Sequence, residues 1–296
     1  MFESWMDFMC PAAIFVAFLA AIPWGRKPWW LVDAATNFTC GLGLILIPQY
    51  VLGFQIVGKM DEVHLHLCRI TGTALIGQAV SWYYSRNSAD NRMFGSQMYT
   101  RIMVCTFLLV AQLYSAYHLW HRSGHRFNDK YLTFSCFGVF LWLLGSLFQM
   151  IKCREFGGYI HKNNWLHTGL LIDSYLSQLL AIASFAFPSQ ILKLTMHTKF
   201  RPDGVHVCLF RTIAALMLGQ AWSSHYCQGF LYMEDKQAHI LGRLTVQILS
   251  FVINTITLFF SDIFSIDYFT PFIVNLFYVT FLMSLYYRAR QKDKDQ

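Results

Sequence analysis

The stretch DEVHLHLCRITGTALIGQAVSWYY, residues 61–84, returns 142 residues later as DGVHVCLFRTIAALMLGQAWSSHY, residues 203–226. Ten of the 24 aligned positions are identical, which apolar composition alone would not produce because several of them are polar. The matched polar pairs are Asp61/Asp203, His64/His206, Arg69/Arg211, Gln78/Gln220 and Ser81/Ser223. Self-similarity at a fixed period is the signature of a repeated structural unit. We therefore expect two copies of one helical unit.

The similarity continues on both sides of this stretch. The further aligned pairs are Arg101/Arg243 and Val104/Val246 at the same shift, and Leu31/Leu171, Asp33/Asp173 and Pro48/Pro188 at a shift of 140. Of the 23 lysines and arginines, only Arg69, Arg101, Arg211 and Arg243 lie inside hydrophobic runs. A cation at such a position is costly in a bilayer. Both copies therefore retain arginines at positions where a charge is energetically unfavourable in a bilayer.

The composition indicates a membrane protein. Hydrophobic residues make up 55% of the chain, charged residues 13%, and the mean hydropathy is +0.39. The net charge of +7 comes from cations dispersed among loops, so it does not predict nucleic-acid binding. The eight cysteines contain no C-x-x-C pair and none recurs between the copies, so we expect free thiols rather than a disulfide framework.

The hydrophobic runs give the expected architecture. They cover residues 6–24, 29–53, 63–85, 97–120, 131–151, 166–192, 205–231, 238–261 and 268–287. The predicted fold class is an all-α polytopic membrane protein, with a tandem parallel repeat of two four-helix transmembrane units after an N-terminal hydrophobic helix. The expected domains are residues 1–28, 29–152 and 153–296. An eight-helix protein, in which residues 6–24 do not span, is the alternative.

The C-terminal tail bears on topology and location. Loop cations number 12 on the side that holds this tail against seven on the other, and an excess of cations marks the cytosolic side. The tail places Lys292 and Lys294 in a K-x-K-x-x ending, which resembles the dilysine signal for retrieval to the endoplasmic reticulum. We therefore predict a cytosolic C-terminus, a multi-pass protein of the endoplasmic reticulum and recognition of the tail by coat protein. A solvated charged tail without a signal is the alternative.

Depth in the membrane predicts which polar residues meet. Asp33 and Arg101 each lie about one turn past the cytosolic start of a run, and the residues aligned with them repeat this placement. Opposite charges pair to make burial tolerable. The expected ligand-binding clusters are Asp33/Gln78/Arg101 and Asp173/Gln220/Arg243. They predict binding or transport of a small solute or a lipid headgroup. A scaffold or cargo adaptor, in which the charges only join helices, is the alternative.

The other repeated polar residues have simpler interpretations. Asp61 and Asp203 are expected to cap helix starts. His64 and His206 have no repeated histidine or carboxylate four residues later to complete a ligand pair, so no metal or other cofactor is predicted. Arg69 and Arg211 stay as repeated polar residues without an assigned role. No facing histidine pair for haem and no Ser/His/Asp set for hydrolysis stands out, which argues against an enzyme.

The two copies differ beside the glutamines. Trp82 and Tyr83 in the first correspond to Ser224 and His225 in the second, and Val80 corresponds to Trp222. We therefore expect a ligand to prefer the second copy, where more hydrogen-bonding groups are available.

A proline near the end of the first run and the pattern R-x7-G-Q in the second, Arg69 to Gln78 and Arg211 to Gln220, resemble DoxX-like four-helix membrane proteins. That resemblance implies architecture and no catalytic residue.

Overall fold

The structure is a computed structural model that describes residues 16–119, 126–153, 155–157, 164–196, 200–264 and 269–294. It is all-helical apart from two strands of two residues each, β1 (Ile56–Val57) and β2 (Arg126–Phe127), which pair antiparallel. Residues 16–24 are helical. The following helices are α2 (Arg26–Leu46), α3 (Pro48–Gln55), α4 (Glu62–Tyr84), α5 (Asn91–Leu119), α6 (Asp129–Cys153), α7 (Trp165–Ala186), α8 (Pro188–Thr195), α9 (Gly204–Cys227), α10 (Met233–Phe260) and α11 (Phe269–Lys294). The all-α prediction is confirmed.

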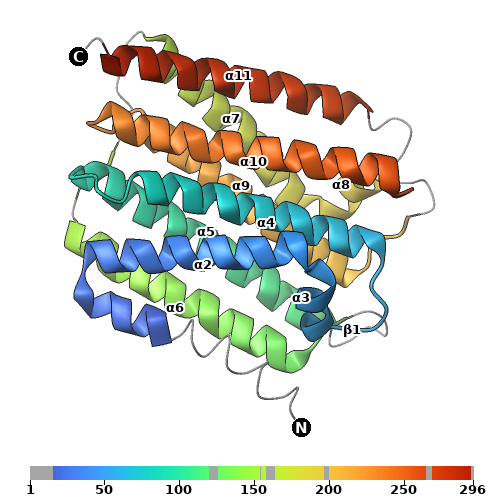
Figure 1. Cartoon of the computed structure of the whole chain (residues 1–296). Helices are drawn as coiled ribbons and strands as arrows, with labels where there is room; N and C mark the ends of the chain where they lie inside the picture. Colours follow the sequence, from blue (N-terminus) through green and yellow to red (C-terminus); the bar gives the residue numbers. More distant parts are fainter. Residues whose placement is uncertain are drawn as a thin grey trace.

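The long helices form two layers, and each layer combines helices from both ends of the chain. In one layer α2 packs on α4, α4 on α10 and α10 on α11, and these helices run side by side in Figure 1. In the other layer α6 packs on α5, α5 on α9 and α9 on α7. Helices α4 and α9 also contact each other between the layers. The helices of residues 29–152 and 153–296 are therefore interleaved and do not form two separate bundles.

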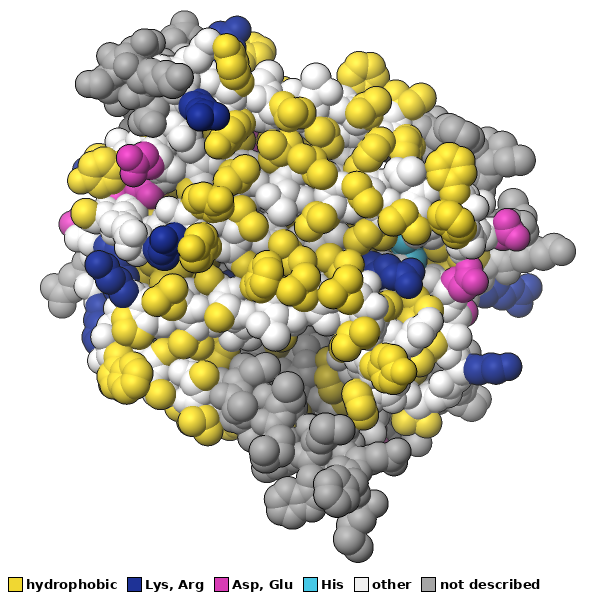
Figure 2. Space-filling view, in the orientation of Figure 1, with side chains coloured by type: hydrophobic (Ala, Val, Ile, Leu, Met, Phe, Trp, Pro, Cys, Tyr) yellow, Lys and Arg dark blue, Asp and Glu magenta, His cyan; other side chains and the backbone are white. Residues whose placement is uncertain are grey.

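Seven of the described helices are long and apolar enough to cross a membrane, namely α2, α5, α6, α7, α9, α10 and α11. Helix α4 is not among them, because it carries two histidines, Arg69 and Gln78 and packs between α2, α9 and α10. The predicted number of nine or eight spans stays a prediction. Part of the expected helix at 6–24 lies outside the described residues. Figure 2 shows apolar side chains over the middle of one face and most charged side chains toward its two ends. This distribution is consistent with a multi-pass membrane protein.

Two glycines bring helices of different sequence regions together. A Cβ at Gly77 of α4 would lie 2.1 Å from Val246 Cγ2 and 2.6 Å from the Gly242 carbonyl oxygen of α10. A Cβ at Gly219 of α9 would lie 2.1 Å from Val104 Cγ2 of α5. Small residues allow such approach between membrane helices. The two contacts therefore use the aligned positions Gly77/Gly219 and Val104/Val246.

Both α2 and α7 end two residues before a proline. The next short helices, α3 and α8, begin with Pro48 and Pro188, and proline suits a first turn because its missing N–H has no helical partner there. The hydrophobic runs continued to residues 53 and 192, so hydropathy alone did not locate these breaks. The prolines place α3 and α8 at the same end of the layers.

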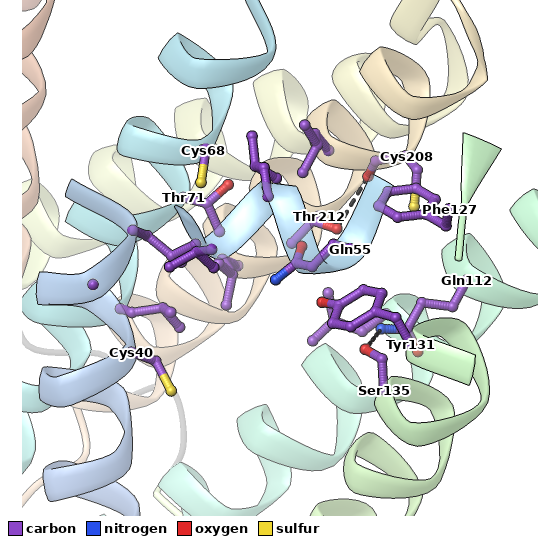
Figure 3. Close-up of a pocket in the computed structure, with 18 of the residues that line it drawn as sticks. Cys40, Gln55, Cys68, Thr71, Gln112, Phe127, Tyr131, Ser135, Cys208 and Thr212 are labelled. Atoms are coloured by element: carbon purple, nitrogen blue, oxygen red, sulfur yellow. Dashed lines mark hydrogen bonds between the residues drawn. The ribbon is translucent and has the colours of Figure 1, made fainter. Parts of the chain in front are cut away.

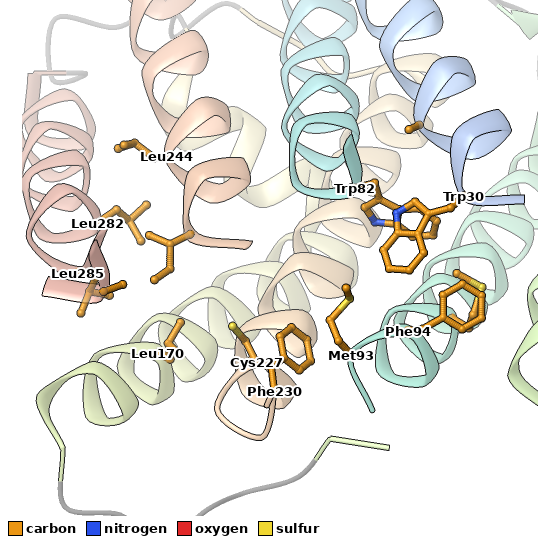
Figure 4. Packing of buried hydrophobic residues seen from close by; sticks show 14 of the residues in the cluster. Trp30, Trp82, Met93, Phe94, Leu170, Cys227, Phe230, Leu244, Leu282 and Leu285 are labelled. Atoms are coloured by element: carbon orange, nitrogen blue, oxygen red, sulfur yellow. The ribbon is translucent and has the colours of Figure 1, made fainter. Parts of the chain in front are cut away.

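The other end is filled by a core of large apolar side chains (Figure 4). Trp30 of α2 contacts Trp82 of α4 and Phe94 of α5, with ring centroids 5.2 and 5.0 Å apart. Leu170 of α7 and Leu285 of α11 belong to the same cluster. Since this core joins both layers, it holds α2 and α5 at the level where their charged residues meet.

Candidate ligand-binding site

Asp33 of α2 and Arg101 of α5 form a buried ion pair. Arg101 Nη2 lies 3.0 Å from both carboxylate oxygens of Asp33, and Arg101 Nε lies 3.2 Å from Oδ2. Their side chains are 0% and 3% exposed, so removing one partner would leave an uncompensated charge away from water. The expected pairing of Asp33 with Arg101 is confirmed.

Asp173 of α7 and Arg243 of α10 form the corresponding pair. Arg243 Nη2 lies 2.7 Å from Asp173 Oδ1, and Nε lies 3.1 Å from Oδ2. Arg243 Nη1 donates to Gln220 Oε1 at 2.8 Å, while Nη2 also donates to Ser177 Oγ and the Tyr278 hydroxyl at 2.6 Å each. Every nitrogen of the Arg243 guanidinium therefore has a partner. The predicted cluster of Asp173, Gln220 and Arg243 is assembled.

The surroundings of the two pairs differ. The Arg101 guanidinium lies 4.3 Å from the ring centroid of Trp142 and 5.1 Å from that of Trp82. Ser224, which aligns with Trp82, instead donates to the Asp173 carboxylate and lies 2.8 Å from His239 Nε2. The first pair thus has aromatic neighbours where the second has hydrogen-bonding ones. The predicted preference of a ligand for the second copy stays a prediction.

The sequence pointed to His225 near the second pair, but His239 occupies that place. The ring of His225 contacts that of Tyr226, with the two centroids 5.5 Å apart. His239 aligns with Gln97, which donates to Ser223 at 2.7 Å. A polar residue at both aligned positions of α5 and α10 was the signal that could have identified it.

Asp173, Ser224 and His239 are the residue types of a hydrolytic triad in a different arrangement. In a triad the histidine lies between the serine and the carboxylate and accepts the serine proton. Here the Ser224 hydroxyl donates directly to Asp173, so His239 Nε2 must be the donor to Ser224. The contacts are those of a buried polar network that joins α7, α9 and α10.

Gln78 of α4 lies beside the second ion pair. It lines a small pocket together with Gly77, Gln220 and Arg243. Helix α4 packs against both α10 and α2, and the predicted cluster of Gln78 with Asp33 and Arg101 stays a prediction. Gln220 extends this contact by donating to the Ala74 carbonyl of α4 at 3.2 Å. Both glutamines therefore belong to the surroundings of Arg243.

A cavity of about 450 Å³ lies between α2, α3, α4, α5, α6 and α9 (Figure 3). This volume is within the range of small-molecule sites, roughly 300–1,000 Å³. Its lining is mainly apolar, and none of the described residues that line it is charged. Figure 3 shows Gln55, Gln112 and Tyr131 on one side, opposite Cys40. A molecule in this cavity would contact apolar walls and a few neutral polar groups.

Two buried oxygens that belong to the lining have no hydrogen-bond partner among the described residues. Asn37 Nδ2 donates to the Asp33 carboxylate at 2.7 Å and to its backbone carbonyl at 2.8 Å, whereas Asn37 Oδ1 is unpaired. Gln112 Nε2 donates to Ser135 at 2.7 Å, whereas Gln112 Oε1 is unpaired. A buried polar atom without a partner costs about 1–3 kcal/mol. Both oxygens are therefore available to a donor group of a bound molecule.

At the far end of α4 and α9, two aspartates and two histidines meet. Asp61 and Asp203 cap the helices and form capping boxes with His64 and His206, as their predicted role requires. The two imidazole rings stack with centroids 3.6 Å apart. Partial burial alone would raise the pKa of each carboxyl, but hydrogen bonds from His206 and His64 outweigh it and hold the pKa of Asp61 and Asp203 well below the usual range.

The repeated Arg69 and Arg211 are not among the described residues that line the cavity. Arg211 donates to the Phe185 carbonyl at 3.1 Å and lies over the Tyr114 ring at 4.2 Å. Arg69 is half-buried on α4. Lys292 and Lys294 fall in the last turn of α11, with side chains outside the described part of the structure.

Comparison with known proteins gives one family. A family model described as a domain of unknown function (DUF8292) matches residues 31–286. No curated protein and no solved structure matches the chain.

Proposed function

The chain belongs to the DUF8292 family, and we propose that it is a multi-pass membrane protein that binds an uncharged amphipathic lipid in the cavity between α2, α3, α4, α5, α6 and α9. The observation that carries this proposal is a pair of carbonyl oxygens, Asn37 Oδ1 and Gln112 Oε1, that have no hydrogen-bond partner among the described residues and belong to a mainly apolar lining whose described residues carry no charge. Such oxygens accept hydrogen bonds, so the ligand must donate one. A hydroxyl group on a long apolar body meets both requirements.

The shape of the lining favours an elongated molecule. Asn37 lies four residues after Asp33 on α2, and Gln112 lies 11 residues after Arg101, the partner of Asp33, on α5. Both helices start at the same end, where Arg26 bonds to Asn91, so the levels of Asn37 and Gln112 differ by about 10 Å along the helices. A molecule that reaches from the level of Asn37 to that of Gln112 would therefore lie lengthwise between the helices. Its apolar body would contact Leu75, Leu108 and Leu216.

The first ion pair has a positioning role in this proposal. Asp33 accepts both hydrogen bonds of the Asn37 amide nitrogen, which turns the amide oxygen away from the carboxylate. Arg101 in turn neutralises Asp33. The charged residues then act through Asn37 and do not contact the ligand, in contrast to direct binding at the Asp/Arg/Gln clusters.

The experiment is photolabelling of purified, tag-free protein in detergent with a photoactivatable long-chain alcohol. We expect saturable labelling that the unlabelled alcohol displaces. The fatty acid of the same length should displace it at least tenfold less well, because none of the described lining residues carries a charge that could pair with a carboxylate. Leu108→Trp should abolish labelling by filling the cavity. Leu113→Trp, on the same helix but 60% exposed, is the matched control and should label normally.

Asn37→Leu and Gln112→Leu then test the two oxygens at nearly constant volume. Weaker labelling in at least one of them, with unchanged elution and thermal stability, supports the proposed acceptors. Labelling that Leu108→Trp leaves intact would place the alcohol elsewhere, and equal competition by the fatty acid would overturn the uncharged headgroup.

A scaffold is the second candidate function, and the saturation of the Arg243 cluster favours it. An arginine with a partner at every nitrogen has little left to offer a ligand, so this cluster serves as a clasp between α7, α9, α10 and α11. The two functions are compatible because the clasp and the cavity use different residues. Transport of the bound molecule stays a prediction.

The finer architecture and the location are also part of the proposal. The aligned glycine contacts and the two interleaved layers support duplication of a four-helix unit, with helices three and four exchanged between the copies. The dilysine-like tail and the cation bias support a cytosolic C-terminus in the endoplasmic reticulum.

A further inference from the structure

We propose that Asp61, His64 and His206 form a binding site for a divalent transition-metal ion such as Zn²⁺, with Asp203 as the carboxylate that orients both histidines. One ligand atom from each of the first three residues lies within 4.8 Å of the others. The site joins the first turns of α4 and α9, far from the charged pairs and independent of the lipid cavity.

The distances suit a metal ion. His64 Nδ1 lies 2.9 Å and His206 Nε2 lies 3.1 Å from Asp61 Oδ1. Zinc ligands at about 2.0–2.1 Å from a tetrahedral centre are about 3.3 Å apart. Imidazole nitrogen and carboxylate oxygen are ligands that zinc accepts. Small shifts of these side chains would therefore open a site among three ligands.

Asp203 supplies the outer contacts that such a site needs. Its Oδ1 lies 2.8 Å from His206 Nδ1 and 3.4 Å from His64 Nε2, the two ring nitrogens that face away from Asp61. If both nitrogens carry protons and donate to Asp203, then His64 Nδ1 and His206 Nε2 present lone pairs toward Asp61. A carboxylate behind a metal-bound histidine sets the tautomer and orients the ring in this way.

Access and geometry are also compatible with exchange of the ion. The histidine side chains are 0% and 2% exposed, while Asp61 is 48% exposed, so the carboxylate forms the open side of the site. The two rings now stack at an interplanar angle of 20°. Because ring lone pairs lie in the ring planes, metal binding must splay the rings. The backbone N–H groups of Asp61 and Asp203, now 3.3 Å from the Nδ1 atoms, would then turn to water.

The spacing of ligand residues within one helix could not reveal this metal site. Neither histidine has another histidine or a carboxylate four residues away, but each meets the aligned histidine of the other copy. Two copies of a helix that contact each other at equivalent positions double every polar residue at the contact. One Asp and one His per copy therefore become two of each.

The test uses tag-free, full-length protein in detergent after chelation, titrated with Zn²⁺ in a calorimeter and with Co²⁺ by visible absorption. We expect one ion per chain and a Co²⁺ spectrum of four-coordinate type. His64→Gln and His206→Gln should each weaken binding at least tenfold and together abolish it. Glutamine is chosen because it can occupy the third helical position of a capping box and so preserve the helix start.

The matched control is His66→Gln, because His66 is a buried histidine on the same helix that contacts Thr257 at 3.1 Å and lies outside the cluster. It should leave stoichiometry and affinity unchanged. Failure of the unmodified protein to bind Zn²⁺ or to give the Co²⁺ spectrum would overturn the site. So would unchanged binding in the double variant or equal loss in the control.

Discussion

The carboxylate of Asp33 and the guanidinium of Arg101 meet in a two-point contact at 3.0 Å although 68 residues separate them. Arg101 also lies beside the faces of Trp82 and Trp142, which attract a cation but accept no conventional hydrogen bond. The stability of α2 against α5 therefore depends strongly on one carboxylate.

Asp33→Asn should lower the free energy of unfolding by about 3–5 kcal/mol, because it leaves Arg101 buried with its charge uncompensated. Asp173→Asn should cost less, since Arg243 keeps Gln220, Ser177 and Tyr278 as acceptors. Thermal and denaturant unfolding in one detergent would measure both. The exposed Asp129 offers the control variant Asp129→Asn, with an effect near zero. Equal losses at Asp33 and Asp173 would contradict this explanation.

The two glycine contacts should respond differently to alanine. At Gly77 the new methyl group meets Val246 Cγ2 and the Gly242 backbone, whereas at Gly219 it meets Val104 Cγ2 closely and other atoms only from 3.6 Å. Overpacking of this kind costs about 1–3 kcal/mol. We expect Val104→Ala to restore most of the stability lost in Gly219→Ala, and Val246→Ala to restore little of that lost in Gly77→Ala. Unfolding midpoints of the single and double variants would show this, and equal rescue would disprove it.

Topology and location can be measured in cells. An epitope placed after Gln296 should be accessible when only the plasma membrane is permeabilised, because the cationic loops and tail predict a cytosolic end. Replacement of Lys292 and Lys294 by Ser should let the protein leave the endoplasmic reticulum if the tail is a retrieval signal. Replacing the exposed Arg290 by Ser is the control for charge and should not change location. A protected epitope would reverse the topology, whereas unchanged location after lysine replacement would remove only the retrieval signal.

Depth along the helices was enough to predict the pairing of Asp33 with Arg101. Asp33 and Arg101 lie at similar distances from the starts of their helices, and a constant rise per residue brings them to one level. Gln78 shows the limit of this reasoning. Its level was close to that of both pairs, but the direction in which it points depends on which helix packs against α4. Hydropathy carries no information about that choice, so the partner of Gln78 could not be deduced.

The cavity and the contact between His64 and His206 could not be predicted from the sequence for a related reason. The cavity is volume left between six helices, and no spacing along the chain encodes it. Stacking of His64 on His206 depends on a contact between the two copies of one helix. The paired identities at 61/203 and 64/206 were visible, yet their meaning required knowing that α4 and α9 touch.

The interleaving of the layers has a consequence for biosynthesis. Helix α4 is complete at Tyr84, but α10, against which its Gly77 surface packs, ends at Phe260. At a translation rate of about 5–20 residues per second, the synthesis of α10 is completed on the order of ten to thirty seconds after that of α4. The Gly77 surface of α4 stays without its packing partner during this time. During this interval a polar, glycine-lined helix must be sheltered by the translocon or by lipid. A nascent chain released after residue 152 would be an unfinished assembly and a target for quality control rather than a smaller version of the protein.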